Sequence, residues 1–186
     1  LSGPGAAWGK PALNGIEMAV EEINLKGLNI NGVTYRFKPV IEDSKYMADV
    51  AVDRVKKLIE RDKVSIVLGC LGSPTSTAQG PICAQNKVLH LTDSFNPAIL
   101  ENEYSFMATV MPIFTGPGYI DFIDENFPGT QKLISVNIDD ESGWAAYRTY
   151  EPGCKAKGWE ISSEPYERGV IEFAPLCAKV AAANPD

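Results

Sequence analysis

The fold is decided near the start of the chain, by Leu1-Ser-Gly-Pro-Gly-Ala-Ala-Trp8-Gly-Lys10 running into Pro11-Ala-Leu-Asn-Gly-Ile-Glu-Met-Ala-Val-Glu-Glu-Ile-Asn24. The Gly and Pro residues predict a loop that carries Trp8, and Pro11 is expected in the first turn of a helix. Apolar residues then recur with the spacing of one buried helix face, at Ile16, Ala19, Val20 and Ile23. Such a loop gathers free backbone N–H groups and a flat ring in one place, which suits a small ligand with an anionic end.

Composition and charge narrow the class of protein. The chain has 186 residues, of which 45% are hydrophobic and 22% are charged, so one or two domains with a sizeable core are expected. A net charge of −7 and a pI near 4.8 argue against nucleic acid or an anionic membrane as the main partner. No apolar run approaches the roughly 18 residues that span a bilayer, so the sequence predicts a soluble globular protein.

Strand and helix signals alternate along the chain, which is typical of an α/β fold with parallel sheets covered on both faces. Strands are predicted at residues 33–41, 64–69, 88–91, 104–110, 132–138 and 159–166. Helices are predicted at residues 47–60, 73–85, 119–126, 143–157 and 172–183. The segment 111–118 contains two Pro and two Gly and interrupts this alternation, so it is the best candidate for a domain boundary.

The four cysteines do not have the Cys-x-x-Cys spacing of a zinc or thioredoxin motif. Cys70 is expected at a strand end and Cys83 on the next helix, too far apart for a disulfide. Cys154 and Cys177 are expected on successive helices, where they either pair or remain small buried thiols.

The opening residues resemble the periplasmic solute-binding proteins of the leucine/isoleucine/valine-binding family, which deliver substrates to ABC importers. Members of that family read SGPxAxWGxxxxxGxxxAVxxIN over this stretch. The resemblance implies a type I periplasmic-binding-protein fold, with two Rossmann-like parallel-sheet lobes, of which this chain is an incomplete N-terminal half. Residues 1–113 are then lobe I, without its first strand and a later return segment, and residues 114–186 are the start of lobe II.

Hydroxyl residues follow the predicted strand 64–69 and open the next helix. Ligands of open parallel sheets bind beyond the carboxyl ends of the strands, where Ser73, Thr75 and the helix start can cradle a carboxylate. Ser and Thr are also common helix caps, so the bare residue types favour capping. The resemblance at Ser73 favours ligand contact, and the two roles can be combined.

The turn after the predicted strand 88–91 departs from the family pattern. It reads Thr-Asp-Ser-Phe-Asn-Pro at residues 92–97, whereas the family commonly has Ser-Pro-Gly-Ala-Thr-Asn-Pro, whose Thr hydroxyl and backbone hold an amino-acid headgroup. Phe95 therefore replaces a hydroxyl with an apolar ring, beside Ser94. Asp93 replaces a small residue, and it can either meet an ammonium group or accept hydrogen bonds from the turn as an Asx residue.

Three acids precede an aromatic residue in Asp139-Asp-Glu-Ser-Gly-Trp144. The motif resembles the family's Asp-Ser-Ala-Trp-Gly, whose aromatic residue faces the cleft, so Trp144 is expected to face Trp8 and Phe95 there. The acids are best explained as an acidic helix start rather than a metal site.

Catalytic groups are scarce. His90 is the single histidine and lies inside a predicted strand, where a structural role is expected. There is no Gly-x-Ser-x-Gly elbow, P-loop or dinucleotide fingerprint. The sequence therefore predicts that the protein is not an enzyme and uses no cofactor or metal.

Together, these features predict an extracytoplasmic solute-binding component of an ABC importer, with a small ligand and a membrane permease as its partners. The ligand is expected to be a small carboxylate with an apolar or aromatic body, either a branched-chain amino acid or an aromatic acid. The protein is expected in the periplasm or outside the cell, with a lipid anchor left open. The alternatives are a ligand-sensing domain of a receptor or regulator with the same fold and, more remotely, a Rossmann-like enzyme. The residues expected to bind the ligand are Trp8, Ser73, Thr75, Asp93, Ser94, Phe95 and Trp144.

Overall fold

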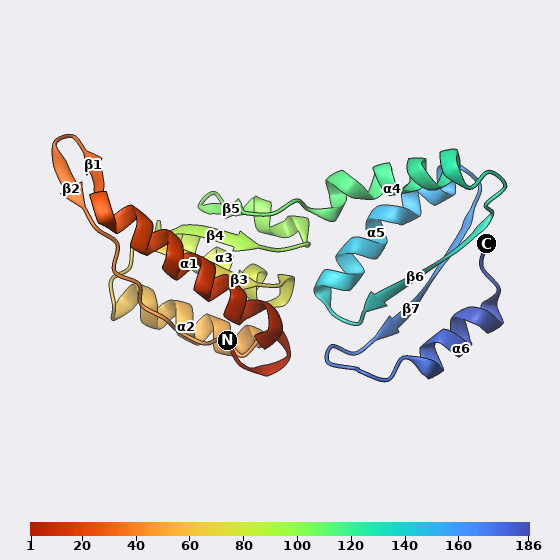
Figure 1. The fold of residues 1–186 in the computed structure, drawn as a ribbon, viewed down its shortest axis with the longest axis horizontal. Coiled ribbons are helices and arrows are strands. Elements are labelled where there is room, and N and C mark those ends of the chain that lie inside the picture. Colours follow the sequence, from red (N-terminus) through yellow and green to blue (C-terminus); the bar gives the residue numbers. More distant parts are fainter.

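The computed structural model describes residues 1–186 and contains two separate parallel sheets (Figure 1). The first sheet has the order β3 (Ile66–Leu71), β4 (Leu89–Asp93) and β5 (Ser105–Met107). The second sheet pairs β6 (Lys132–Ile138) with β7 (Glu160–Tyr166), in continuous register from end to end. The predicted α/β fold with two sheet-containing lobes is therefore confirmed, and we call residues 1–107 lobe I and residues 112–186 lobe II.

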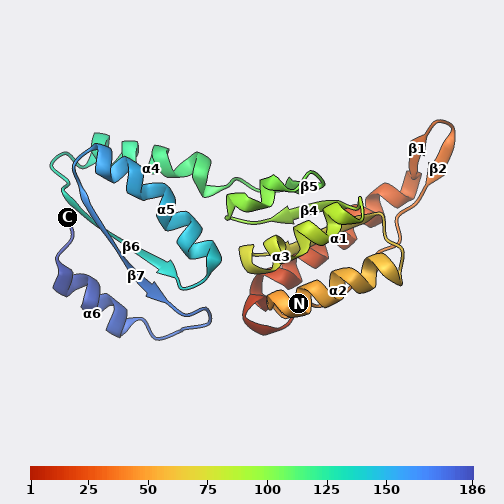
Figure 2. The same cartoon turned by 180° about the vertical axis from the view of Figure 1, so that it is seen from behind.

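Helices cover both faces of the lobe I sheet (Figures 1 and 2). Helix α1 (Ala6–Lys26) crosses one face, while α2 (Ala48–Glu60) and α3 (Ser73–Gln85) pack together on the other. A short antiparallel hairpin, β1 (Leu28–Ile30) with β2 (Val33–Tyr35), projects from the end of α1 that lies away from lobe II. The core between α2, α3 and β3 is formed by Val55, Ile59, Val67, Cys83 and Val88. Burying side chains of this size stabilises the fold by about 1.5–3 kcal/mol each.

In lobe II, α4 (Pro112–Asn126) and α5 (Glu141–Ala156) pack against each other on one side of the strand pair. Helix α6 (Ala174–Ala183) lies against β7 on the opposite side (Figures 1 and 2). The lobe II pair is therefore also flanked by helices on both faces.

The segment 111–118 is the start of a helix, and the prediction that it breaks the alternation was wrong. Pro112 is in the first turn of α4, where a backbone N–H has no helical partner, so proline is tolerated there. Pro117 lies inside the same helix. The predicted boundary after residue 113 falls within the first turn of α4, and because α4 packs with α5 we propose residues 108–111 as the boundary.

Two predictions near the N-terminus are also corrected. Helix α1 begins at Ala6, so Trp8 lies in its first turn rather than in a loop, and Pro11 lies inside the helix. Of the predicted strand 33–41, only residues 33–35 pair with another strand. Beyond them, the Asn24 side chain exchanges hydrogen bonds of 2.7 and 2.8 Å with the backbone of Phe37. An alternating apolar pattern forms a ladder only where a second strand lies alongside, and here a side chain takes that place.

The buried polar groups agree with the sequence expectations. All four cysteines are free, as predicted for Cys70 and Cys83, and Cys154 does not pair with Cys177. Cys154 is a buried thiol as expected, but Cys177 is exposed, so the expectation of a buried thiol was wrong there. His90 is fully buried, with Nδ1 3.0 Å from Ser105 Oγ and Nε2 3.0 Å from the Gly69 carbonyl oxygen. Burial lowers the pKa of His90. Its role is therefore structural, as predicted.

Candidate ligand-binding site

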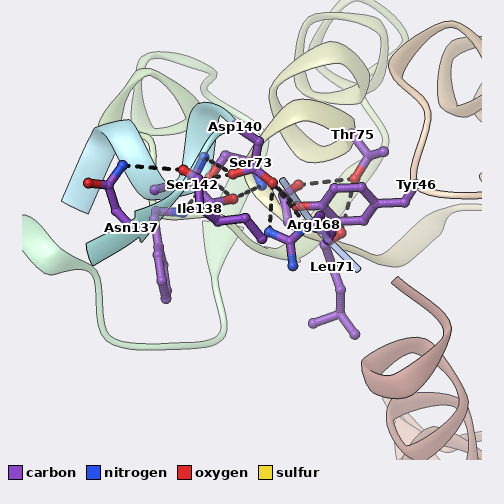
Figure 3. A network of polar contacts seen from close by, with 12 residues as sticks. Tyr46, Leu71, Ser73, Thr75, Asn137, Ile138, Asp140, Ser142 and Arg168 are labelled. Atoms are coloured by element: carbon purple, nitrogen blue, oxygen red, sulfur yellow. Dashed lines mark hydrogen bonds and ion pairs between the residues drawn. The ribbon is translucent and has the colours of Figure 1, made fainter. Parts of the chain in front are cut away.

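Two helix N-termini meet at the junction between the lobes, that of α3 from lobe I and that of α5 from lobe II (Figure 3). The backbone N–H of Ser73 donates to Ser142 Oγ at 3.1 Å, and the Ser142 hydroxyl donates to Ser73 Oγ at 3.1 Å. Both serines are buried. Gly143, the next residue of α5, packs so close to Ile138 that a Cβ would lie 1.9 Å from the Ile138 carbonyl oxygen. Glycine is therefore required where α5 turns away from β6.

Ser73 also shapes the turn that follows β4. Its Oγ accepts hydrogen bonds from the backbone N–H groups of Phe95, at 2.8 Å, and Asn96, at 3.2 Å. The Asn96 N–H also lies 3.2 Å from Ser94 Oγ, which accepts from it. These contacts hold the backbone that carries the Phe95 ring, which is 38% exposed.

Arg168 is the centre of a second polar cluster, on the loop between β7 and α6 (Figure 3). Its Nε and one terminal nitrogen donate to Asp140 Oδ2 at 3.0 and 2.6 Å. The Tyr46 hydroxyl donates to the same oxygen at 3.1 Å. The guanidinium lies 4.5 Å from the ring centroid of Tyr46 and 5.4 Å from that of Trp8, both within the range of cation–π attraction. Arg168 thus connects lobe II to two aromatic rings of lobe I.

Asp140 is the N-cap of α5 and binds donors through both oxygens. Its Oδ1 accepts from the backbone N–H groups of Ser142, at 2.9 Å, and Gly143, at 3.2 Å. Burial opposes ionisation of Asp140, but hydrogen bonds from Arg168 and the helix backbone outweigh it and hold the pKa of this carboxyl below its usual range. The residue is therefore a carboxylate at neutral pH.

Tyr46 reaches this cluster because Gly72, the N-cap of α3, has no side chain. A Cβ on Gly72 would lie 2.4 Å from a carbon of the Tyr46 ring, and the backbone φ of +95° also favours glycine. A third contact between the lobes is made by Glu141, which accepts from Thr77 Oγ1 at 3.0 and 3.2 Å and from the Asn96 side-chain amide.

A cavity of about 300 Å³ that is open to solvent lies beside these contacts and is lined from both lobes. Lobe I contributes Trp8 and Phe95, while lobe II contributes residues 135–138 of β6, the start of α5 and three further side chains, Tyr150, Tyr166 and Arg168. Trp8 is 56% exposed, so its ring is available to a ligand. Arg168 is the only charged side chain of the lining. The space therefore suits a small anion with an apolar or aromatic body.

Five of the residues selected from the sequence lie outside this lining. They are Ser73 and Ser94, whose contacts are given above, and Thr75, Trp144 and Asp93. Thr75 is buried, and its hydroxyl donates to the carbonyl oxygens of Leu71 and Gly72 at 3.1 and 3.0 Å. The Trp144 indole N–H donates to Asp139 Oδ1 at 2.8 Å, and its ring packs edge-on against Tyr147 with 5.8 Å between centroids.

Asp93, the last of these five residues, accepts no hydrogen bond through its side chain, so the Asx interpretation was wrong. Ser94 and Asn96 supply the side-chain acceptors of that turn, the latter for the Ala98 N–H at 3.0 Å. Burial raises the pKa of Asp93.

The sequence reasoning missed Arg168, Tyr46, Tyr150 and Tyr166. Ser142 could have been found, because it opens a helix after a parallel strand as Ser73 does. Arg168 lies in a loop with no recognisable pattern, and only the fold brings it to Asp140, 28 residues earlier.

No group of three or more His, Cys, Asp or Glu side chains is arranged to hold a metal ion. None of the helices is both long enough and apolar enough to cross a membrane.

Comparison with known proteins gives a consistent result. A sequence model described as periplasmic binding protein matches residues 1–186. A search of curated protein sequences gave no match. Among solved structures, a solute binding protein of an ABC transporter from Rhodopseudomonas palustris BisB5, in complex with 3,4-dihydroxy benzoic acid, is 22% identical with a TM-score of 0.83. It matches 100% of this chain and 50% of that protein.

Two further structures have similar scores. The branched-chain amino acid transporter substrate binding protein LivJ from Streptococcus pneumoniae, in complex with isoleucine, is 23% identical with a TM-score of 0.82, covering 100% of this chain and 52% of that one. A solute binding protein from R. palustris in complex with 4-hydroxybenzoate is 18% identical with a TM-score of 0.80, covering 99% and 49%. The chain thus spans about half the length of these structures, which share its fold. Because the family model matches every residue, the chain belongs to the periplasmic binding protein family, with the type I fold.

Proposed function

We propose that the protein is the solute-binding component of an ABC importer and binds a small carboxylate with an apolar or aromatic body between its lobes. The observation that carries this proposal is the cavity of about 300 Å³ whose lining combines aromatic rings of both lobes with a single cation. Membership of a solute-binding family supports binding rather than catalysis. The proposed location is outside the cytoplasm, free or lipid-anchored, with a membrane permease as partner.

Binding is proposed to begin on one lobe and to end with the lobes closed. Trp8 and Phe95 offer ring faces from lobe I, and the end of β6 with the start of α5 completes the enclosure. The contacts between Ser73 and Ser142 and between Tyr46 and Asp140 hold the lobes together around the ligand. Removal of water from the closed cavity strengthens the polar contacts inside it.

The remaining residues selected from the sequence are proposed to act indirectly. Ser73, Thr75 and Ser94 fix the start of α3 and the turn that carries Phe95. Trp144 fixes Asp139 at the start of α5. Asp93, near the end of β4, has a carboxylate without a hydrogen-bond partner. It lies outside the cavity lining, so only a ligand that extends beyond the cavity could bring an ammonium group to it.

Calorimetric titration of the complete gene product tests the proposal. The ligands of the similar structures, 4-hydroxybenzoate and isoleucine, define the two classes to compare, with a neutral sugar as control. In a separate denaturation experiment, a bound carboxylate present at 100 times its dissociation constant should raise the unfolding free energy of the protein by about 2.7 kcal/mol. Binding of the sugar, or no binding of any carboxylate, would contradict the proposal.

A further inference from the structure

Arg168 is held rigidly at the edge of the cavity with part of its guanidinium unused. The side chain is 16% exposed and packs between the Tyr46 and Trp8 rings. Only Nε and one terminal nitrogen are bound, both to Asp140 Oδ2, so the other terminal nitrogen has no partner in the protein. A guanidinium fixed on one side in this way presents its remaining N–H groups to a ligand without further loss of side-chain entropy.

The neighbouring carboxylate does not cancel this cation at the cavity. Asp140 accepts five hydrogen bonds, from Arg168, Tyr46 and two backbone N–H groups of α5. Its charge therefore also compensates the positive end of the α5 dipole. The edge of the cavity next to Arg168 keeps a positive character.

No acidic side chain faces the cavity. The lining contains four aromatic rings, Trp8, Phe95, Tyr150 and Tyr166, and neither Asp93 nor Asp140 belongs to it. An ammonium group placed inside would lose its hydration without gaining a carboxylate partner, which is costly in a closed site. A carboxylate, in contrast, meets Arg168.

We propose that Arg168 anchors the carboxylate of the ligand and that the cavity selects carboxylic acids that lack an α-amino group. The inference rests on the proposed function, namely that a small carboxylate binds between the lobes. It assigns the charge recognition to a loop residue of lobe II, while the rings of lobe I recognise the apolar body.

Three ligands with one skeleton test this selection on the complete gene product: 3-phenylpropionate, its neutral amide and phenylalanine. The wild-type protein is expected to bind the acid at least about tenfold more tightly than either of the others, as for hydrogen bonds to a charged group. Arg168→Gln should bring the acid and the amide to within about threefold of each other. A merely structural role of Arg168 would lower both affinities and leave their ratio unchanged.

Arg148→Gln is the matched control, because Arg148 is exposed on α5 and lies outside the lining. It should keep the wild-type ratio. If Arg168→Gln does not fold, Arg168→Lys replaces it: the charge remains but the planar fork is lost, so the acid should bind several-fold more weakly yet still better than the amide.

Each contrary outcome has a distinct meaning. A tenfold preference for the acid that survives in Arg168→Gln, or an unchanged acid affinity in Arg168→Lys, overturns the role of Arg168. Tighter binding of phenylalanine than of 3-phenylpropionate overturns the selection against an amino group. Failure of the wild type to bind any carboxylate overturns the proposed function itself, and this inference with it.

Discussion

The two helix starts that meet at the lobe junction are built differently. Helix α3 begins with hydroxyl residues after Gly72 and has neither an acidic residue in its first turn nor a side-chain cap. Helix α5 begins with acids, and Asp140 caps its backbone N–H groups. Lobe II therefore supplies the acceptors for both helix starts. Asp140 accepts from the N–H groups of α5, and Ser142 accepts from the Ser73 N–H of lobe I. Asp140 thus occupies the α5 start and Ser142 takes the first N–H of α3, while Arg168 is the cation that lines the cavity.

Asp140→Ala should have the largest effect on stability. The change removes the α5 cap and leaves Arg168 without its partner, so we expect the unfolding free energy to fall by about 3 kcal/mol. Urea denaturation monitored by circular dichroism measures this. Asp139→Ala is the control, because Asp139 accepts only from Trp144 and should cost less than about 1 kcal/mol. Equal losses for the two variants would show that the α5 start does not depend on its cap.

Ser73→Ala tests the corresponding position in lobe I. It removes a buried hydroxyl that accepts from the Phe95 N–H, the Asn96 N–H and the Ser142 hydroxyl. Of these donors only the Asn96 N–H keeps another acceptor, Ser94 Oγ, so stability should fall by about 2 kcal/mol. Ser65→Ala, at an exposed serine of the same lobe, should change stability by less than about 0.5 kcal/mol. If Ser73→Ala proves as mild as the control, Ser73 is not needed to hold the turn.

Phe95→Thr tests the ring contribution of lobe I to the cavity. It restores the hydroxyl usual in the family and removes one aromatic face, so affinity for 3-phenylpropionate should fall about fivefold. Phe114→Thr, at an exposed ring of α4 outside the lining, should bind as the wild type does. An unchanged affinity in Phe95→Thr would place the ligand away from this turn.

The smallest expected effects concern pH. Asp140 of lobe II and Asp93 of lobe I should make stability depend on pH in opposite directions. The folded-state pKa of Asp140 is below its unfolded value, so its contribution is complete above the unfolded pKa and is lost as pH falls through the folded one. The folded-state pKa of Asp93 is raised by burial, so the carboxylate costs stability at neutral pH, and that cost disappears as pH falls.

Variants at the two positions measure this difference. Asp140→Asn should be less stable than the wild type at pH 7, with a gap that closes in acid. Asp93→Asn should be slightly more stable at pH 7, and its advantage should vanish below pH ~4. Stability curves with the same sign for both variants would contradict the contrast between the lobes.

The regular elements could largely be predicted from the sequence. The helix Ser73–Gln85 and the strand Lys132–Ile138 have the predicted bounds. The helix is marked by the hydroxyl residues that open it, and the strand by its apolar residues. The prediction of a strand at 33–41 and that of a break at 111–118 were wrong, because both depended on contacts with distant parts of the chain. A strand needs a neighbour, and the α4 start is supported by packing on α5.

The site was predictable only in part. Trp8 and Phe95 could be selected because each follows a recognisable motif, and both line the cavity. Arg168 and Tyr46 could not, because they come from loops and meet at Asp140 only after both lobes have folded. Tyr46 and Arg168 are 94 and 28 residues from Asp140 in the sequence, and contacts over such separations leave no local sequence pattern.

A crystal structure of the complete gene product with 3-phenylpropionate tests the central claim most directly. The ligand is expected between the lobes, with its carboxylate within hydrogen-bond distance of the free Arg168 nitrogen and its ring beside Trp8 and Phe95. A carboxylate bound instead at the α3 start, with Ser73 released from Ser142, or a ligand outside this cavity, would contradict it.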